Sequence, residues 1–252
     1  MKLLLDLGNT RLKWALREGA AWAAQGAVGW NEDVVLALHD AWRGMATPNR
    51  VFGASVVDGG RESQIAAVIS ACFALDIEWL RTPAEACGVR NAYPEPSRLG
   101  VDRFLAMVAV HADSPLPCVL AGVGTALTLD ALTADGQHLG GLIAPGPQLM
   151  QQSLLGATSR VRVERPGRIL EAADNTPDAV ASGCWQAAAA LIERFVAHMS
   201  GPLGGSPMLV LGGGDAEVLL PLLSHPARLS PDGVLRGLAV WSDAHSPLAP
   251  AF

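Results

Sequence analysis

The sequence has few cysteines, no long apolar run and no cluster of basic residues. The four cysteines lie far apart without a Cys-x-x-Cys pair, which favours reduced thiols over disulfides or zinc. No apolar run reaches the roughly 18 residues of a membrane span. Asp6 and Gly8 interrupt the segment that a signal peptide would need to keep apolar, so we expect a cytoplasmic protein.

The charged residues and the histidines also form no pattern that would indicate a particular partner. The net charge is −6, and no basic run is present, so nucleic acid and anionic membranes are not expected partners. The six histidines form no cluster along the chain, and we therefore predict neither a zinc site nor a catalytic histidine.

Two glycine turns are the most informative features that the sequence does contain. Residues 6–10 read Asp-Leu-Gly-Asn-Thr, and a fainter copy, Gly-Val-Gly-Thr, recurs at 122–125. Each turn follows an apolar run and precedes a second run typical of a strand. Oriented backbone amides bind anions, and glycine lets oxygen approach the main chain, so the pair predicts a duplicated phosphate site. An ordinary hairpin with Asn-containing turn chemistry is the alternative for either turn alone.

The two turns differ in their polar side chains. In the first, Asp6 is suited to hold Mg²⁺ beside the phosphates, and Lys13 can offset phosphate charge. Aligning the glycines places Gly122 where the first turn has Asp6, so the second turn lacks that carboxylate. Thr125 offers a hydroxyl there. Asp130, on the strand beyond, is either a supporting group or part of a polar strand face.

A third group of candidate residues surrounds a predicted helix start. Tyr93 is the only tyrosine, in a loop rich in proline, and Asp102 and Arg103 follow Gly100. A carboxylate at this position can orient a hydroxyl and take its proton, while an arginine can pair with an anionic substrate. The alternative is an ordinary helix-start aspartate with a surface arginine.

Hydrophobic patterning predicts a three-strand meander followed by helix and strand, occurring twice. We expect a first half at 1–114 and a second at 115–252, joined at the proline-rich segment 114–117. The expected strands are 2–7, 11–17, 20–28, 50–57, 77–80, 118–122, 125–133, 138–144 and 208–211. The expected helices are 34–42, 63–74, 97–111 with Ser97 as cap, 145–155, 176–198, 215–224 and 233–242. Irregular structure is expected at 83–96 and 156–174, and fraying after Ser246.

Three smaller signals have two interpretations each. The glycines at 140–141 and 146 suit either a close backbone approach or a simple turn. Thr176 precedes a helical pattern, where it is either a ligand-binding residue or the N-cap. The three glycines at 212–214 lie either against a nucleotide or in a tight connection.

Taken in order, these motifs resemble those of the type III pantothenate kinases, the family that includes the Bvg accessory factor proteins. The resemblance covers most of the chain. The matching motifs are Asp6-x-Gly-Asn-Thr10, Tyr93 with Gly100-x-Asp-Arg103, Gly124-Thr-Ala-x-Thr-x-Asp130, Gly140-Gly-x-Ile-x-Pro-Gly146 and Asn175-Thr176.

The resemblance implies a duplicated α/β fold of the acetate and sugar kinase, Hsp70 and actin superfamily, which is ribonuclease H-like, with a cleft between two halves. It also implies a homodimer that transfers the γ-phosphoryl of ATP, with Mg²⁺, to pantothenate, giving 4′-phosphopantothenate in the first step of coenzyme A biosynthesis. By motif position, the residues that bind ATP would be Asp6, Leu7, Gly8, Asn9, Thr10, Arg11, Leu12, Lys13 and Thr125. Those that bind pantothenate would be Tyr93, Gly100, Val101, Asp102, Arg103 and Thr176, with Asp102 as the proton acceptor.

One departure from the family pattern concerns a monovalent cation. The family usually has an aspartate at the position of Gly122, and that aspartate binds potassium or ammonium. Here either other oxygens hold the cation, or the dependence is weakened, or the chain is a poor catalyst, so no metal ligand is assigned to Gly122. A non-catalytic nucleotide-binding regulator and a kinase with another acceptor are the rival functions.

Overall fold

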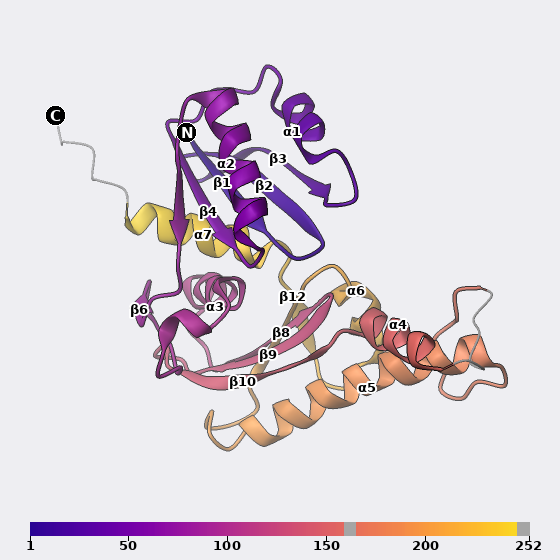
Figure 1. Ribbon diagram of the computed structural model, residues 1–252. Helices are drawn as coiled ribbons and strands as arrows, with labels where there is room; N and C mark the ends of the chain where they lie inside the picture. The colour runs from indigo at the N-terminus through magenta and orange to yellow at the C-terminus, as the bar shows by residue number, and fades with distance from the viewer. Residues whose placement is uncertain (159–164, 246–252) are drawn as a thin grey trace. The chain divides into compact units, whose positions relative to one another are not determined.

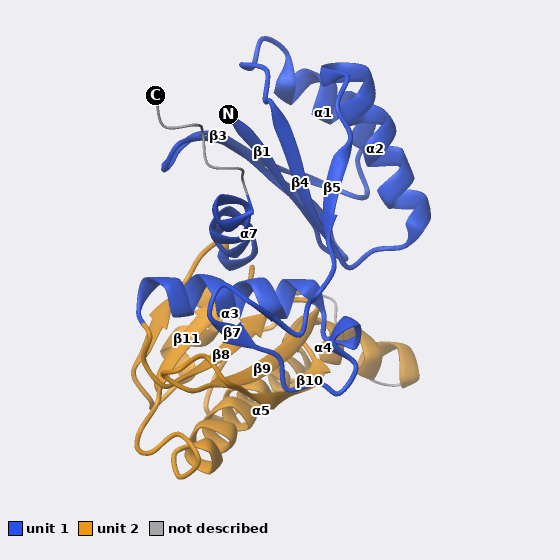
Figure 2. Ribbon diagram, turned by 90° about the vertical axis from the view of Figure 1, so that its left-hand side faces the viewer, with its two compact units in different colours: residues 1–114, 233–252 blue, residues 115–232 orange. Residues whose placement is uncertain are grey.

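The structure, a computed structural model, describes residues 1–158 and 165–245. The chain divides into two compact units, residues 1–114 with 233–252 and residues 115–232 (Figure 2). The boundary expected after residue 114 is also a boundary of these units, but the last helix, α7 (Gly233–Ala244), belongs with unit 1. Its buried Leu235 and Leu238 pack with Leu4, Phe52 and Leu105, which explains the assignment.

Unit 1 contains a five-stranded sheet in the order β3-β2-β1-β4-β5. The first three strands form an antiparallel meander, and β4 and β5 continue the sheet in parallel with β1. Its elements are β1 (Lys2–Leu7), β2 (Arg11–Glu18), β3 (Ala21–Gly29), α1 (Val34–Trp42), β4 (Arg50–Ser55), α2 (Gly59–Phe73), β5 (Ile77–Leu80), β6 (Glu85–Ala86), β7 (Val89–Arg90), η1 (Pro96–Arg98) and α3 (Val101–Asp113), with α7.

The sheet of unit 1 is covered on both faces. Side chains alternate across a strand, and in β1 Leu3 and Leu5 pack with Leu38 of α1 and Ile69 of α2. Leu4 points to the other face, among residues of α3 and α7. Figure 1 shows α1 and α2 on one side of this sheet and α7 on the other. The continuous apolar run in β1 is therefore typical of a strand buried on both sides.

Unit 2 repeats the arrangement, with a five-stranded sheet in the order β10-β9-β8-β11-β12. Here β8, β9 and β10 form the meander, and β11 and β12 are parallel to β8. Its elements are β8 (Cys118–Val123), β9 (Ala126–Leu132), β10 (His138–Pro145), α4 (Pro147–Ala157), α5 (Thr176–Met199), β11 (Met208–Gly212), α6 (Ala216–Leu219), η2 (Leu220–Leu222) and β12 (Ala227–Leu229). The identical strand order confirms the predicted duplication.

Several local predictions were wrong. The segment 83–96, expected to be irregular, contains the short strands β6 and β7. Ser97 does not cap a helix, because 96–98 forms the short η1 turn and α3 begins at Val101. Helix α2 begins four residues earlier than expected, since the Asp58 side chain accepts from the amides at its start. The helix expected at 215–224 is only α6 followed by η2, and the short strand β12 was not expected.

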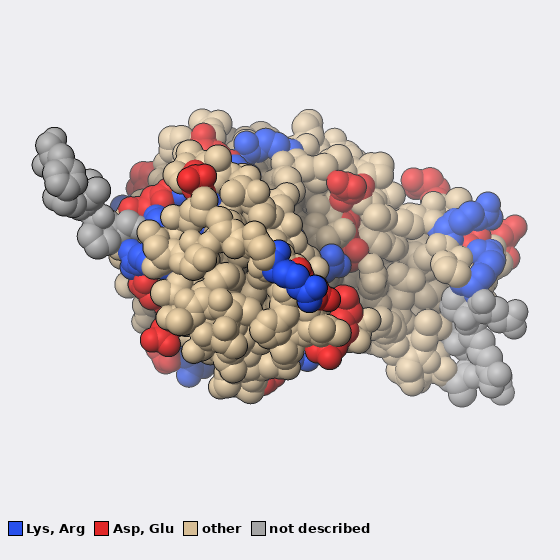
Figure 3. All heavy atoms as spheres, turned by 90° about the horizontal axis from the view of Figure 1, so that it is seen from above, with Lys and Arg blue, Asp and Glu red and all other residues tan. Residues whose placement is uncertain are grey.

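Parts of two predictions lie outside the described residues, namely 159–164 within the loop expected at 156–174 and the tail after Ser246. Across the described ranges, no helix is both long and apolar enough to cross a bilayer. On the face seen in Figure 3, Lys and Arg lie beside Asp and Glu in small mixed groups on a largely uncharged surface.

Candidate active site

The first glycine turn connects β1 to β2 in unit 1. Strand pairing ends at Leu7 and Leu12, and the Gly8 amide donates to the Arg11 carbonyl at 3.1 Å. Asn9 and Thr10 are exposed at the tip. Leu7 and Leu12 are fully buried, so any contact of theirs with ATP must use the main chain.

Asp6 and Lys13 lie directly opposite one another at the base of this turn. Cross-strand partners in an antiparallel pair project from the same face, so carboxylate and ammonium stand together there. Mg²⁺ in kinases is bound by one or two carboxylates together with phosphate oxygens and water. The single carboxylate of Asp6 fits that ligand set, and Lys13 fits the neighbouring phosphate charge.

The second turn, between β8 and β9, is one residue shorter than the first. Pairing ends at Val123 and Leu127, and the Gly124 amide donates to the Ala126 carbonyl at 3.1 Å. Thr125 is exposed at its tip, as its motif position requires.

Gly146, which directly follows β10, fixes the second turn. Its amide donates to the Thr125 carbonyl at 2.9 Å. A Cβ at residue 146 would lie 1.8 Å from the Gly124 carbonyl oxygen, so no other residue fits without moving the turn. Of the two interpretations of this glycine, the structure supports the close backbone approach.

Gly122 occupies the base of the second turn without a carboxylate. A Cβ there would lie 2.6 Å from Thr128 Oγ1, so the threonine hydroxyl takes the space that a longer side chain would enter. The base of this turn therefore lacks the aspartate that would bind a monovalent cation.

The triple glycine at 212–214 also supports the second turn. Gly213 has φ +94°, and a Cβ there would lie 2.1 Å from the Val123 carbonyl oxygen. The Asp215 amide donates to the same carbonyl at 3.1 Å. These glycines make a tight connection that packs against the end of β8.

Asp102 lies in the first turn of α3. Its Oδ1 accepts the amide of Arg103 at 2.8 Å, and a helix N-terminus favours the ionised carboxylate. A Cβ at Gly100 would lie 2.5 Å from that oxygen, so the glycine leaves room for the carboxylate. Val101 is buried, which leaves only its main chain for contact with a ligand.

The structure brings Tyr93 and Arg103 together beside Asp102. Arg103 Nη1 donates to the Tyr93 hydroxyl at 3.2 Å, and the guanidinium lies 5.9 Å from the tyrosine ring centre. Arg103 is only 6% exposed, so the interpretation of a surface arginine was wrong. The loop that carries Tyr93 is shaped by Asn91, whose side chain accepts the Tyr93 amide and donates to the Pro96 carbonyl.

Thr176 is the first residue of α5 and is exposed, while Asn175 is the N-cap. The N-cap interpretation of Thr176 was therefore wrong. Behind it, the buried Asp178 accepts from Arg165 Nη1 at 2.9 Å and from Arg168 Nη2 at 3.0 Å. These bonds, above all the one from Arg165, hold the pKa of Asp178 well below its usual range.

Asp130 forms a buried pair with His138 inside unit 2. The two residues are 3% and 1% exposed, and His138 Nε2 lies 2.9 Å from Asp130 Oδ1. Asp130 therefore does not lie on an exposed strand face. No group of three or more His, Cys, Asp or Glu suited to a metal occurs in the described parts of the chain.

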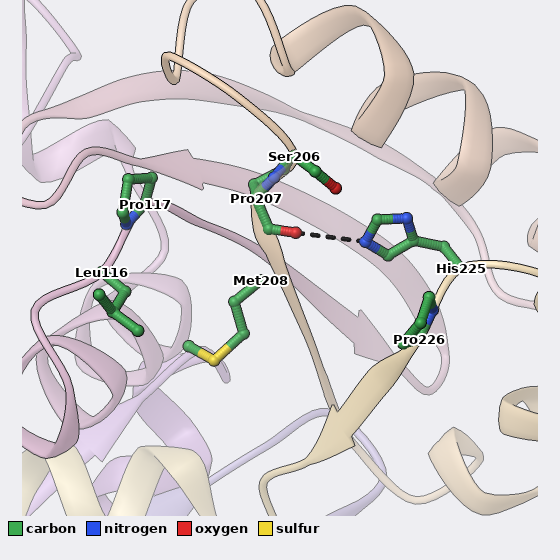
Figure 4. Close-up of a pocket in the computed structure, with 7 residues that line it drawn as sticks. All are labelled: Leu116, Pro117, Ser206, Pro207, Met208, His225 and Pro226. Atoms are coloured by element: carbon green, nitrogen blue, oxygen red, sulfur yellow. Dashed lines mark hydrogen bonds between the residues drawn. The ribbon is translucent and has the colours of Figure 1, made fainter.

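A cavity of about 480 Å³ lies in unit 2 at the amino-terminal ends of the parallel strands, away from the end of β8 that leads into the second turn (Figure 4). Leu116, Pro117, Met208 and Pro226 line it where β8, β11 and β12 begin, and His225 Nε2 lies 3.2 Å from the Pro207 carbonyl. Ligands of open α/β sheets bind outside the carboxyl ends of the strands, where the second turn lies. This cavity is therefore not a candidate for the phosphate site.

Sequence reasoning missed residues that act through hydrogen bonds to distant main-chain atoms. Trp30 Nε1 donates to the Gly8 carbonyl at 2.7 Å, and Thr82 Oγ1 donates to the Leu99 carbonyl at 2.7 Å just before α3. Neither residue is part of a sequence motif, so a single sequence does not reveal which main-chain atom its side chain contacts.

Two like sheets, each with a glycine turn between its first strands, define a duplicated α/β fold of the actin-like and sugar kinase type. The nucleotide-bound activator of 2-hydroxyisocaproyl-CoA dehydratase from Clostridium difficile shares this fold, at 12% identity, TM-score 0.56 and 99% coverage of both chains. A candidate 2-dehydro-3-deoxygalactonokinase from Sinorhizobium meliloti is similar at 15% identity and TM-score 0.66, over 98% of this chain and 100% of its own.

Residues 2–198 match the family described as type III pantothenate kinase. A type III pantothenate kinase from Laribacter hongkongensis is 42% identical over 240 residues, which cover 95% of this chain and 97% of the relative. The chain belongs to the type III pantothenate kinase family.

Proposed function

We propose that the chain, a pantothenate kinase, phosphorylates the primary hydroxyl of pantothenate in the cytoplasm, using the residues described above. ATP is the phosphoryl donor, and 4′-phosphopantothenate, the first intermediate of coenzyme A biosynthesis, is the product. The group of Asp102, Arg103 and Tyr93 around Gly100 is the observation that supports this assignment most, because it joins a proton acceptor to an anion-binding residue.

The glycine turns bind the ATP phosphates through backbone amides, with Thr125 contributing from the second turn. Asp6 would hold Mg²⁺, which neutralises phosphate charge, and Lys13 adds a second positive charge. Phosphoryl transfer has a loose transition state with little covalent chemistry for the protein, so positioning and electrostatics supply most of the rate.

Asp102 accepts the proton of the pantothenate hydroxyl and orients its oxygen toward the γ-phosphorus. Arg103 pairs with the substrate's carboxylate, and its bond to Tyr93 fixes the guanidinium for that contact. Thr176, exposed at the start of α5, contributes a hydroxyl for the polar groups of pantothenate.

The function is tested by ADP release from the purified protein with ATP and Mg²⁺, with and without pantothenate. We expect release that depends on pantothenate. Nucleotide binding without any turnover would support the regulator, and turnover with another hydroxyl compound alone would support the other kinase.

Gly122 supplies no carboxylate that could bind a monovalent cation. We therefore propose that potassium raises the activity of this enzyme only slightly. Gly122→Asp combined with Thr128→Ala, which removes the hydroxyl 2.6 Å from the new Cβ, should introduce potassium activation. Strong activation of the wild-type enzyme by potassium would contradict the proposal.

We also propose a homodimer, supported by exposed apolar side chains on β10 and α4. Leu142, Ile143 and Leu154 are 42%, 65% and 40% exposed, and β10 is an edge strand of its sheet. Edge strands with apolar side chains pair readily with other chains. Ile143→Glu should shift the mass measured by light scattering from dimer to monomer, whereas Val218→Glu, at a separate exposed apolar residue, should not.

A further inference from the structure

Trp30 holds the first glycine turn at two points. It directly follows β3, and its amide donates to the Thr10 carbonyl at 3.2 Å. Its indole Nε1 donates to the Gly8 carbonyl at 2.7 Å. One residue therefore fixes main-chain oxygens on both sides of the exposed Asn9.

The indole is itself held in place. The Arg61 guanidinium lies 4.7 Å from the ring centre, within the range of a cation–π contact. Just before Trp30, the Gly29 amide donates to Glu32 Oε1 at 2.8 Å and the Glu32 amide donates back to the Gly29 carbonyl at 3.1 Å. The ring thus acts from a fixed position.

Unit 2 has the same device in a different form. Gly146 follows the third strand of its sheet as Trp30 does, and donates to Thr125 as Trp30 donates to Thr10. At Gly146, however, the main chain passes so close to the Gly124 carbonyl that a Cβ would lie 1.8 Å from its oxygen, and this carbonyl corresponds to that of Gly8. The two units therefore constrain the same carbonyl, one by a side chain and the other by close packing.

We propose that Trp30 is a positioning residue for ATP, acting through the first turn; this inference rests on the proposed function. In a trans peptide, the carbonyl oxygen and the following N–H point in opposite directions. Fixing the Gly8 carbonyl against the indole therefore directs the Asn9 amide to the opposite side, where a phosphate oxygen can accept it. The hydrogen bond removes the need to order this peptide when ATP binds.

Trp30→Phe tests the proposal, because it keeps an aromatic ring for Arg61 and removes the N–H donor. A neutral hydrogen bond contributes about 0.5–1.5 kcal/mol, so the Kd of a non-hydrolysable ATP analogue, measured by calorimetry without pantothenate, should rise about 2- to 10-fold. The KM for ATP should rise in parallel, while the KM for pantothenate stays unchanged. Trp22→Phe, at an exposed residue of β3, is the matched control and should leave both values unchanged.

Replacement of Trp30 by β-(3-benzothienyl)alanine gives a second test that preserves shape, since only sulfur replaces the N–H. It should weaken analogue binding as Trp30→Phe does, with at most a small fall in melting temperature, because the packing of the ring is kept. Wild-type Kd in this variant would overturn the proposal, as would an equal rise in the pantothenate KM. Since Kd is read without pantothenate, failure of the wild type to phosphorylate pantothenate would refute the proposed function separately.

Discussion

The turn of unit 1 and the turn of unit 2 connect equivalent strands of their sheets but carry different side chains. The first has Asp6 opposite Lys13 at its base, and the second has Gly122 opposite Thr128. The first also has an extra residue and an indole donor, whereas the second is held by main-chain hydrogen bonds and close main-chain packing. The charged side chains at the base of the two turns thus belong to unit 1, and the turn of unit 2 has none at its base.

This difference indicates a division of roles within the duplication. Asp102 and Arg103 also lie in unit 1, so the groups proposed to handle metal, proton and substrate charge are largely on one side of the repeat. In the proposed site, unit 2 would contribute hydroxyls and amides, which can bind phosphate without adding a titrating group. The following predictions test this division, starting with the largest effect.

Removing the proposed proton acceptor should have the largest effect. General-base catalysis contributes about 10²–10⁴-fold, so Asp102→Asn should lower kcat by a factor in that range. Binding of an ATP analogue should remain nearly unchanged, because the turns do not depend on this carboxylate. Normal turnover in steady-state assays would exclude Asp102 as the base.

Disturbing the closely packed turn of unit 2 should come next. Gly146→Ala places a Cβ 1.8 Å from the Gly124 carbonyl oxygen, and such overpacking costs about 3 kcal/mol in the free energy of unfolding. A 1 Å displacement can cost about 100-fold in rate, so kcat/KM for ATP should fall by that order. Gly124→Ala, whose Cβ meets nothing within 4 Å, is the control in urea unfolding and should retain wild-type stability.

Gly100→Ala should act on catalysis without acting on stability. The new Cβ would lie 2.5 Å from Asp102 Oδ1, the end of a side chain that can rotate away. We expect kcat to fall about 10- to 100-fold through misplacement of the carboxylate, with an unchanged melting temperature. Full activity in this variant would show that the position of Asp102 is not critical.

The smallest predicted effect concerns pH and the base of α5. The folded-state pKa of Asp178 is lowered, so the unfolded chain binds more protons in acid. Its contribution to stability is therefore complete above about pH 4 and is lost as the pH falls below that value. Asp178→Asn should unfold more easily in urea at pH 7, and its stability should decline less than that of wild type between pH 4 and pH 3.

Regular elements with a clear pattern were predictable from the sequence alone. The strand at 77–80 and the helix at 34–42 were predicted with the observed bounds, because apolar spacing determines both. The prediction that Ser97 caps a helix failed because Ser97 lies inside η1, where the Leu99 amide donates to the Pro96 carbonyl before α3 begins. Strand β12 was missed because its three residues contain too little pattern to detect.

Residues of the candidate site could be predicted where they lie together in a sequence motif. They could not be predicted where only tertiary contacts bring them to the site. A glycine that a close backbone approach requires, such as Gly146, can be identified in the sequence because it is a glycine. The structure then gives the reason, since a Cβ there would lie 1.8 Å from the Gly124 carbonyl oxygen. Trp30 could not be found in this way, since its hydrogen bond spans 22 residues. The burial of Arg103 and the pairing of Asp130 with His138 likewise depend on packing.

A crystal structure with Mg²⁺, a non-hydrolysable ATP analogue and pantothenate tests the central claim most directly. We predict phosphate oxygens within hydrogen-bonding distance of backbone amides in both glycine turns, with the pantothenate hydroxyl next to Asp102. Phosphates bound at only one turn, or a hydroxyl remote from that carboxylate, would contradict the account.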